Sequence, residues 1–341
     1  MTDRSENRSA LSAPTWGTTV LVLAAIAVGA LLGLLGPELG ASLSQGIDPT
    51  LLAIVGLLFF EVRLGAVKQS VMSPRVIALA WAANFLIIPF IGYAIAALFL
   101  SGQPLLFTGL VIYFLAPCTD WFLAFTRMAH GDTALGAALL PMNMLTQLLL
   151  YPLWLLLFTS HTGVVDFQTI PDALLSWFVT PFIAAQILRW GLSRILVAAA
   201  FDKTCAWVGA AIPILTAALV LQIFAANITV IATHFEAFGL VLAAIFCFFV
   251  ITYGVAEGLS RLFNLSYRHQ VVLAMTTAAR NAPLMLAVTA IAIPDQPLVY
   301  AALVIGMLVE FPHLAGLKQV LLSRVTGQKG AAGQPGSATS S

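Results

Sequence analysis

Long apolar stretches separated by short polar ones dominate this 341-residue chain. A helix that crosses the hydrocarbon core of a bilayer needs about 20 mostly apolar residues. Ten stretches meet that criterion, at residues 15–36, 49–67, 76–100, 104–127, 134–158, 173–192, 206–226, 237–260, 269–293 and 297–322. The pattern therefore predicts an all-α polytopic membrane protein with ten transmembrane helices.

The positive charges test this division independently, because short cytoplasmic loops keep Lys and Arg whereas exported loops lose them. Of the 15 Lys and Arg residues, all except Arg280 fall in the two tails, at the end of the tenth stretch, or around the connections that follow the second, fourth, sixth and eighth helices. The five opposite connections contain no Lys or Arg. Both termini are therefore predicted to be cytoplasmic, and the number of spans to be even.

Composition excludes several classes of protein. Only 9% of the residues are charged and 60% are apolar, against about 25% charged in an average soluble domain. The dispersed Lys and Arg form no basic stripe, which argues against a nucleic-acid partner. Cys118, Cys205 and Cys247 lie in different apolar stretches and indicate neither a disulfide framework nor a zinc site. No H-E-x-x-H or comparable catalytic motif occurs, so we expect no enzyme, no metal and no cofactor.

Two of the predicted helices contain proline beside polar residues near their centres. The fourth reads A-P-C-T-D over Ala116–Asp120, and the ninth reads R-N-A-P over Arg280–Pro283. Proline removes a backbone donor and clashes with the preceding turn, so both helices should be interrupted there. Interrupted helices at corresponding positions of two halves are typical of transporters built from inverted repeats.

The two halves give the predicted organisation of the chain. We expect a cytoplasmic tail at 1–14, a first five-helix repeat at 15–158, a second, inverted repeat at 173–322, and a flexible cytoplasmic tail at 323–341. Aligning the segments after the two breaks pairs Asp132 with Asp295 and Gln147 with Glu310. This sequence similarity is weak by itself. The prediction of inverted repeats therefore rests on the odd number of spans in each half and on the equivalent breaks.

Polar residues from five helices fall at a common central depth. They are Asn84, Cys118, Thr119, Asp120, Asn143, Gln147, Thr276, Thr277, Arg280, Asn281 and Glu310. Any single Asn or Thr is readily explained as a hydrogen bond between helices. Three ionisable groups at one depth are harder to explain in that way, because a charge at the bilayer centre costs several kcal/mol. We therefore predict a transport site with a buried charge pair, Arg280 with Asp120.

At these residues the chain resembles the arsenite-efflux permeases, the Acr-type arsenical-resistance family of the bile acid:sodium symporter superfamily. Cys118 is followed by the Gly131–Asp132 pair, and Val304–Pro312 reads V-I-G-M-L-V-E-F-P, close to the family's V-I-G-P-L-V-E-x-P. The resemblance covers all ten stretches. It implies export of arsenite or a related trivalent metalloid across a bacterial-type cytoplasmic membrane, by a carrier with broken, crossing helices 4 and 9.

The resemblance gives roles to the central residues. Trivalent arsenic is soft and prefers thiolate, which favours Cys118 as a ligand. Thr119, Asn143, Gln147 and Asn281 would line the substrate site.

The coupling ion is predicted from the charged positions. Glu310 would carry the proton of a proton antiporter, and a salt bridge between Glu310 and Arg280 is the structural alternative. The superfamily's sodium-coupled members resemble one another in an acidic residue where this chain has Thr276, and in a Gln where it has Arg280. A fixed guanidinium repels sodium. The alternative function is symport of an organic anion, with Arg280 as its anchor, so the predicted partners are a small solute, protons and the lipid bilayer.

Overall fold

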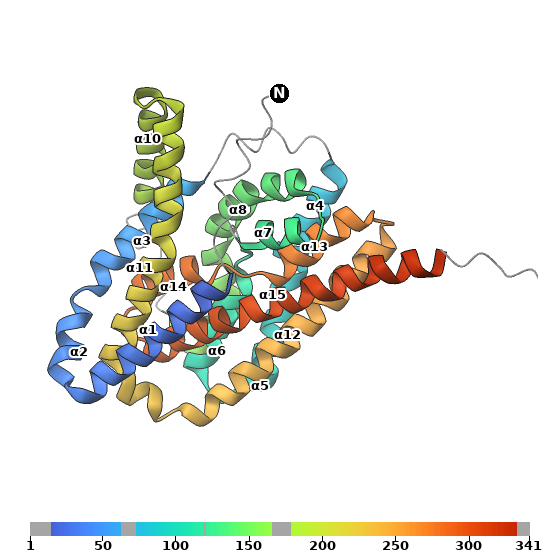
Figure 1. The fold of residues 1–341 in the computed structure, drawn as a ribbon. Coiled ribbons are helices and arrows are strands. Elements are labelled where there is room, and N and C mark those ends of the chain that lie inside the picture. Colours follow the sequence, from blue (N-terminus) through green and yellow to red (C-terminus); the bar gives the residue numbers. More distant parts are fainter. Residues whose placement is uncertain (1–14, 63–72, 119–120, 166–178, 333–341) are drawn as a thin grey trace, which may run out of the picture.

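The computed structural model describes residues 15–62, 73–118, 121–165 and 179–332. Within these ranges all regular structure is helical (Figure 1). Five of the described segments are long and apolar enough to cross a membrane, or six when the bent helix at 133–162 counts as one span. The long ones are Glu38–Glu61, Pro74–Leu100, Ala198–Ala232, Phe235–Leu262 and Pro297–Arg324. The chain is therefore a multi-pass helical membrane protein.

The helices follow one another in this order: α1 (Thr15–Leu35), α2 (Pro37–Ser44), α3 (Ile47–Glu61), α4 (Pro74–Ala82), η2 (Ala83–Ile87), α5 (Ile88–Leu100), α6 (Pro104–Leu115), α7 (Trp121–Met128), α8 (Thr133–Thr159), η3 (Ser160–Thr162), α10 (Thr180–Ile195), α11 (Ala198–Ala232), α12 (Phe235–Leu262), α13 (Tyr267–Ala278), α14 (Ala282–Ala292) and α15 (Pro297–Ala332). Each of the ten predicted stretches overlaps at least one of them.

Helix ends differ from the predicted ones in three places. A short extra helix, α2, occupies the first outer connection, where Pro37 stands in its first turn after the extended Gly36. Helix α11 begins at Ala198, before the apolar stretch, and α15 continues to Ala332, into the segment expected to be a flexible tail. The reason is general, since hydropathy marks where a membrane ends whereas a helix continues until a residue breaks its hydrogen bonding. No proline follows Pro312 within α15.

Helices α1 and α11 run side by side (Figure 1). Their contact needs glycine: a Cβ on Gly29 would lie 2.4 Å from the carbonyl oxygen of Leu221, and one on Gly33 would lie 2.3 Å from that of Ala225. Small residues four apart allow such close packing of membrane helices. Helix α3 packs on α11 and α10. These helices form one part of the molecule, which we call the α1/α3/α10/α11 unit.

The other helices surround the two broken ones. Helix α15 packs along α6, α5 packs on α6 and α12, and α13 packs on α12 and α7. At the centre the rings of Phe114 and Phe248 stack with centroids 4.0 Å apart. Contacts of α14 with α3, and of α15 with α1 and α11, join this part to the α1/α3/α10/α11 unit. The predicted site therefore lies inside the second part, close to the first.

Candidate functional site

The two interrupted helices cross and bond to each other at their breaks. Residue Pro117, between α6 and α7, forms an isolated antiparallel bridge with Arg280, between α13 and α14. The amide of Cys118 donates to the carbonyl of Ala279 at 3.0 Å, and the amide of Asn281 donates to that of Ala116 at 2.9 Å. Inside a membrane each exposed backbone group would cost several kcal/mol. Each break therefore supplies the hydrogen bonds that the other one lacks.

Local sequence explains why the chain breaks where it does. Ala116 and Ala279 both have extended backbone angles, with φ/ψ of −105°/110° and −78°/137°. Pro117 cannot continue the hydrogen-bond ladder of α6, and Pro283 falls in the first turn of α14, where its missing N–H costs nothing. The side chain of Asn281 caps α14 by accepting from the amide of Leu284 at 3.4 Å. The prediction of two interrupted helices is confirmed.

Arg280 is fully buried at the crossing, and its guanidinium binds backbone carbonyls. It donates to the carbonyl oxygens of Phe114 at 3.0 Å, Thr276 at 3.2 Å and Thr277 at 2.6 Å. These carbonyls belong to the last turns of α6 and α13, where a helix has unpaired acceptors and partial negative charge. The guanidinium also lies 5.5 Å from the centre of the Phe248 ring. Arg280 thus caps two helix ends with one charge.

Glu310 and Cys118 lie at the same crossing. The Glu310 carboxylate, 2% exposed, accepts a hydrogen bond from the backbone amide of Arg280 at 3.0 Å. Glu310 lies in the central part of α15, and this hydrogen bond holds it at the break between α13 and α14. Cys118 is 1% exposed and follows the proline of the other break. Cys118 and Glu310 therefore both bond to the backbone of the break between α13 and α14, Cys118 through its amide and Glu310 through its carboxylate.

Thr276 joins three helices on one side of the crossing. Its hydroxyl accepts from the side-chain amide of Asn84 at 3.0 Å and from that of Asn143 at 3.3 Å. Asn84 lies in η2, a π-helical turn that precedes Pro89, and such turns are frequent at functional sites. Asn143 lies on α8, so the third, fifth and ninth predicted helices meet here. All three side chains are fully buried.

Three amide oxygens beside this junction have no donor among the described residues. They are Oδ1 of Asn84, Oδ1 of Asn143 and Oε1 of Gln147, which is one turn beyond Asn143 on α8. The amide nitrogen of Gln147 donates to the sulfur of Met144 at 3.0 Å, so only its oxygen stays unpaired. A buried acceptor without a donor costs about 1–3 kcal/mol. Such a cluster is suited to a ligand that brings its own hydrogen-bond donors.

The structure brings most of the predicted site residues together. Cys118, Asn281, Arg280 and Glu310 share the crossing, and Asn143 with Gln147 lie on the neighbouring face of α8. Thr119 and Asp120 lie outside the described residues, so the pairing of Arg280 with Asp120 stays a prediction. Away from the site, Glu257 forms an ion pair with Arg261 at 2.9 Å, and Gln270 and Arg324 also bind this carboxylate.

Tyr113 belongs to the site and was missed from the sequence. It is fully buried on α6, and its hydroxyl donates to the carbonyl oxygen of Gly306 on α15 at 3.1 Å. A tyrosine within an apolar stretch is normally interpreted as an aromatic residue of the core. One signal in the sequence could have indicated it. Tyr113 stands four residues before Pro117 at one break, just as Thr276 stands four residues before Arg280 at the other.

Helix breaks that bond to each other, with a buried acid and a buried arginine, within a multi-pass helical bundle are typical of a transporter, and this is the class of the protein. Residues 49–234 match the Sodium Bile acid symporter family, and the chain belongs to that family. It is also 28% identical over 187 residues to the arsenical-resistance protein Acr3 of Corynebacterium glutamicum, which supports its resemblance to the Acr-type branch. That match covers 52% of this chain and 46% of the relative, so the chain matches about half of the relative's length.

Proposed function

We propose that this protein exports arsenite, or a related trivalent metalloid, by proton antiport with alternating access. The observation that carries the proposal is the group of three unpaired amide oxygens of Asn84, Asn143 and Gln147, in a site that also holds Cys118. In our proposal Cys118, Thr119, Asn143, Gln147 and Asn281 bind the substrate. The name of the Corynebacterium relative, an arsenical-resistance protein, points to the same class of solute.

The chemistry of the substrate fits those oxygens. Arsenous acid is neutral at pH 7 and carries three hydroxyl groups, each a hydrogen-bond donor. Three acceptors without donors are complementary to it, because every hydroxyl would satisfy an oxygen that otherwise stays desolvated. When the Cys118 thiol forms a bond to the arsenic, one As–O bond breaks and that hydroxyl leaves as water with the thiol proton, so the remaining two hydroxyls stay as donors to the amide oxygens. A neutral substrate also avoids the cost of moving a charge through the membrane.

The contacts of Arg280 bear on the two alternatives. An organic carboxylate is bound best by two guanidinium N–H groups at once. Both terminal nitrogens of Arg280 already donate to Phe114, Thr276 and Thr277, and among the described residues its Nε alone of the three nitrogens has no partner. A sodium ion at this place would meet the guanidinium charge and would compete with it for the same carbonyl oxygens. The hydrogen bonds of Arg280 therefore favour a neutral substrate over an anion, and its charge favours a proton over sodium as the coupling ion.

Glu310 is the proposed proton carrier. A buried carboxyl group beside the helix break can take up a proton when the site opens to one side and release it when the site opens to the other. When it is charged, the amide of Arg280 stabilises it by the 3.0 Å hydrogen bond. Substrate and proton would then compete for the site, since protonation changes the hydrogen bonding of the crossing to which Cys118 and Asn281 also belong.

We propose ten spans in two inverted repeats, 15–158 and 173–322, with tails at 1–14 and 323–341. The backbone bridge joins Pro117 to Arg280, and the alignment of the two halves pairs Gln147 with Glu310, in both cases 163 positions apart. Thr276 lies 163 positions after Tyr113, and Asn143 lies 163 positions before Gly306. The contact between Tyr113 and Gly306 is therefore matched by the contact between Thr276 and Asn143. Contacts repeated at one separation support a two-fold relation.

The proposed orientation has both termini in the cytoplasm of a cell with a bacterial-type inner membrane. It rests on the distribution of Lys and Arg. Two contacts agree with it: Arg324, in the C-terminal part of α15, meets Glu257 near the end of α12, and Arg268, in the first turn of α13, lies 4.0 Å from Asp132 just before α8. Each of these ends is assigned to the same side.

Expression in an arsenite-sensitive bacterium tests the substrate. We expect resistance to arsenite, and everted vesicles should accumulate arsenite when the pH gradient is imposed. Cys118→Ser nearly preserves volume but replaces a soft ligand by a hard one, so export should be abolished while the protein still reaches the membrane. Cys205→Ser and Cys247→Ser are matched controls, because both thiols lie away from the crossing, and they should export normally.

Two results would contradict the proposal. Export at the parental rate by Cys118→Ser would remove the thiol ligand from the mechanism. Failure of the parent to transport arsenite, combined with uptake of an organic anion such as a bile acid, would favour the alternative in which Arg280 is an anion anchor.

A further inference from the structure

His313 is a titratable side chain in the central part of α15 to which the proposed transport cycle gives no role. It stands three residues after Glu310, and residues three apart on a helix are neighbours on one face. The Nε2 atom of His313 is buried and has no hydrogen-bond partner among the described residues. A buried polar atom without a partner costs about 1–3 kcal/mol. Packing alone therefore does not explain a histidine at this position.

The imidazole of His313 lies flat on the ring of Phe249 of α12. The two ring centroids are 3.7 Å apart, and the ring planes are within 2° of parallel. The face of an aromatic ring attracts a cation, so Phe249 stabilises the imidazolium form when His313 takes up a proton. The preceding residue, Phe248, lies 5.5 Å from the guanidinium of Arg280. Two consecutive phenylalanines thus support a fixed cation and a group that can become one.

Two more groups that can carry a proton follow Phe249 on the same face of α12. Tyr253 comes four residues later and Glu257 four residues after that, and residues four apart share a helix face. The hydroxyl of Tyr253 is buried and has no partner in the described part of the chain. Arg324 of α15 binds Glu257 and lies 5.4 Å from the centre of the Tyr253 ring. This face of α12 therefore leads toward the side that we propose to be cytoplasmic.

These groups form a row along the contact between α12 and α15. The two helices pack on each other, and the contacts of Phe249 with His313 and of Glu257 with Arg324 show that they run in the same direction. From Phe249 to Glu257 the helix rises about 12 Å. Internal waters bind buried polar atoms that lack protein partners, and such waters can connect Nε2 of His313 to the Tyr253 hydroxyl. The row is, in order, Glu310, His313, Tyr253 and Glu257.

Other titratable groups on the helices packed against α15 have partners or lie at helix ends. At the crossing, Tyr113 and Arg280 donate to backbone carbonyl oxygens. Lys318, five residues after His313, points to a different side of α15. The groups at the ends proposed to be cytoplasmic are Arg127 of α7, Asp202 and Lys203 of α11, Arg261 of α12, and Arg268 and His269 of α13. Helices α1 and α14 contain no titratable side chain.

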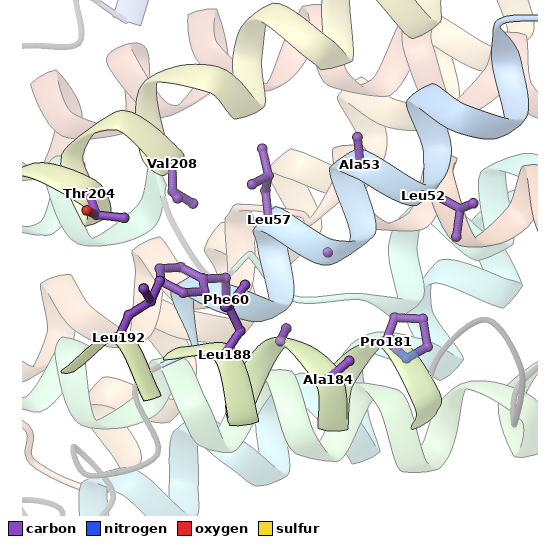
Figure 2. Close-up of a pocket in the computed structure, with 12 residues that line it drawn as sticks. Leu52, Ala53, Leu57, Phe60, Pro181, Ala184, Leu188, Leu192, Thr204 and Val208 are labelled. Atoms are coloured by element: carbon purple, nitrogen blue, oxygen red, sulfur yellow. The ribbon is translucent and has the colours of Figure 1, made fainter. Parts of the chain in front are cut away.

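A cavity of about 430 Å³ between α3, α10 and α11 is a less suitable route for a proton. Figure 2 shows its lining, in which every side chain is apolar except that of Thr204. The Thr204 hydroxyl donates to the carbonyl oxygen of Ala200 within its own helix. Proton relays in membrane proteins are built from chains of titratable side chains. The lining of this cavity has none, whereas the row along α12 and α15 has four.

We propose that His313 is the relay that takes the proton from Glu310 toward the cytoplasm, a role that rests on the proposed proton antiport. The Glu310 carboxyl group gives its proton to the neutral imidazole, which leaves a carboxylate and an imidazolium. The imidazolium then gives a proton to water at the Tyr253 hydroxyl and becomes neutral again, and the proton leaves past Glu257. Histidine suits this step because it exchanges protons near neutral pH.

His313→Phe tests the relay in everted vesicles. Phenylalanine keeps an aromatic ring on Phe249 and removes the unpaired Nε2, so the protein should fold normally. Net arsenite uptake driven by a pH gradient requires proton release, whereas exchange of arsenite for arsenite at equal pH does not. We expect net uptake to fall about 100-fold, the lower end of what a positioned proton-transfer group contributes, and exchange to stay unchanged. His269→Phe is the matched control and should keep both activities.

A second measurement does not involve arsenite. After a rapid rise in pH, the loss of the Glu310 proton in the purified full-length protein is followed by the infrared band of its carboxyl group, identified as the band missing in Glu310→Gln. His313→Phe should slow this loss about 100-fold. Tyr253→Phe, which removes only an unpaired hydroxyl, should slow it less.

The two measurements separate the relay from the proposed function. An unchanged rate of proton loss in His313→Phe would overturn the relay, whatever solute the protein carries. Equal losses of net uptake and exchange would also overturn it, because His313 would then act on substrate movement and not on the proton. Slow proton loss in His313→Phe, in a parent that transports no arsenite in either mode, would support the relay and refute arsenite export.

Discussion

Replacing Arg280 by methionine would remove the guanidinium but keep a long apolar side chain. In the parent, the terminal nitrogens of this buried group donate to the carbonyl oxygens of Phe114, Thr276 and Thr277. Methionine offers no donor, so these three oxygens lose their partners in a region that water does not reach easily. We expect the ends of α6 and α13 to become unstable at the crossing.

The size of the effect follows from the three hydrogen bonds. A buried acceptor left without a donor costs about 1–3 kcal/mol, which gives about 3–9 kcal/mol for three. Removing the buried charge itself recovers part of that loss, because its desolvation no longer opposes folding. Arg280→Lys keeps the charge and three donors but lacks the planar fork, so its loss should be smaller. The order of stability should be parent, then Lys, then Met.

Thermal unfolding of the purified protein in detergent measures this order. Arg268→Met is the matched control, because the Arg268 side chain is 66% exposed and its ion pair with Asp132 spans 4.0 Å. An exposed pair contributes about 0–1 kcal/mol. If Arg280→Met unfolds at the same temperature as Arg268→Met, and loses only the binding of an organic anion, Arg280 is an anion anchor and our interpretation of it is wrong.

Three further outcomes are expected. Glu310→Gln keeps the shape of the side chain but cannot exchange a proton, so arsenite uptake into everted vesicles should lose its dependence on the pH gradient; a sodium requirement in the parent would contradict this. Asn143→Leu removes one unpaired oxygen and one hydrogen bond to Thr276, so it should weaken arsenite binding roughly 10-fold or more. The binding is measured as the protection of Cys118 from a thiol reagent by arsenite. Unchanged protection would argue against a role of the three amide oxygens in substrate binding. A topology reporter after Ser341 should be active only in the cytoplasm and one at Gly163 only outside, and the reverse pattern at either site would refute the ten-span prediction.

Much of the fold follows from local features of the chain. The two breaks were predictable because Pro117 and Pro283 act on their own helices, whatever surrounds them. The proximity of Asn143, Arg280 and Glu310 was predictable because buried polar groups in a membrane need partners at their own depth. Helix ends such as Ala198 and Ala332 were not predictable, because hydropathy locates the membrane boundary and not the last hydrogen bond of a helix.

The sequence by itself determined the class of this protein, since apolar lengths, alternating charge and prolines are properties of neighbouring residues. It also predicted an arginine and a glutamate at the centre of the membrane. Only the tertiary structure decided their partners: Arg280 binds carbonyls of its own helix and of Phe114, while Glu310 accepts the Arg280 amide. The reason is physical. Phe114 and Arg280 are separated by 166 positions, and a pattern along the chain cannot say which of many buried acceptors a guanidinium will meet when the helices cross.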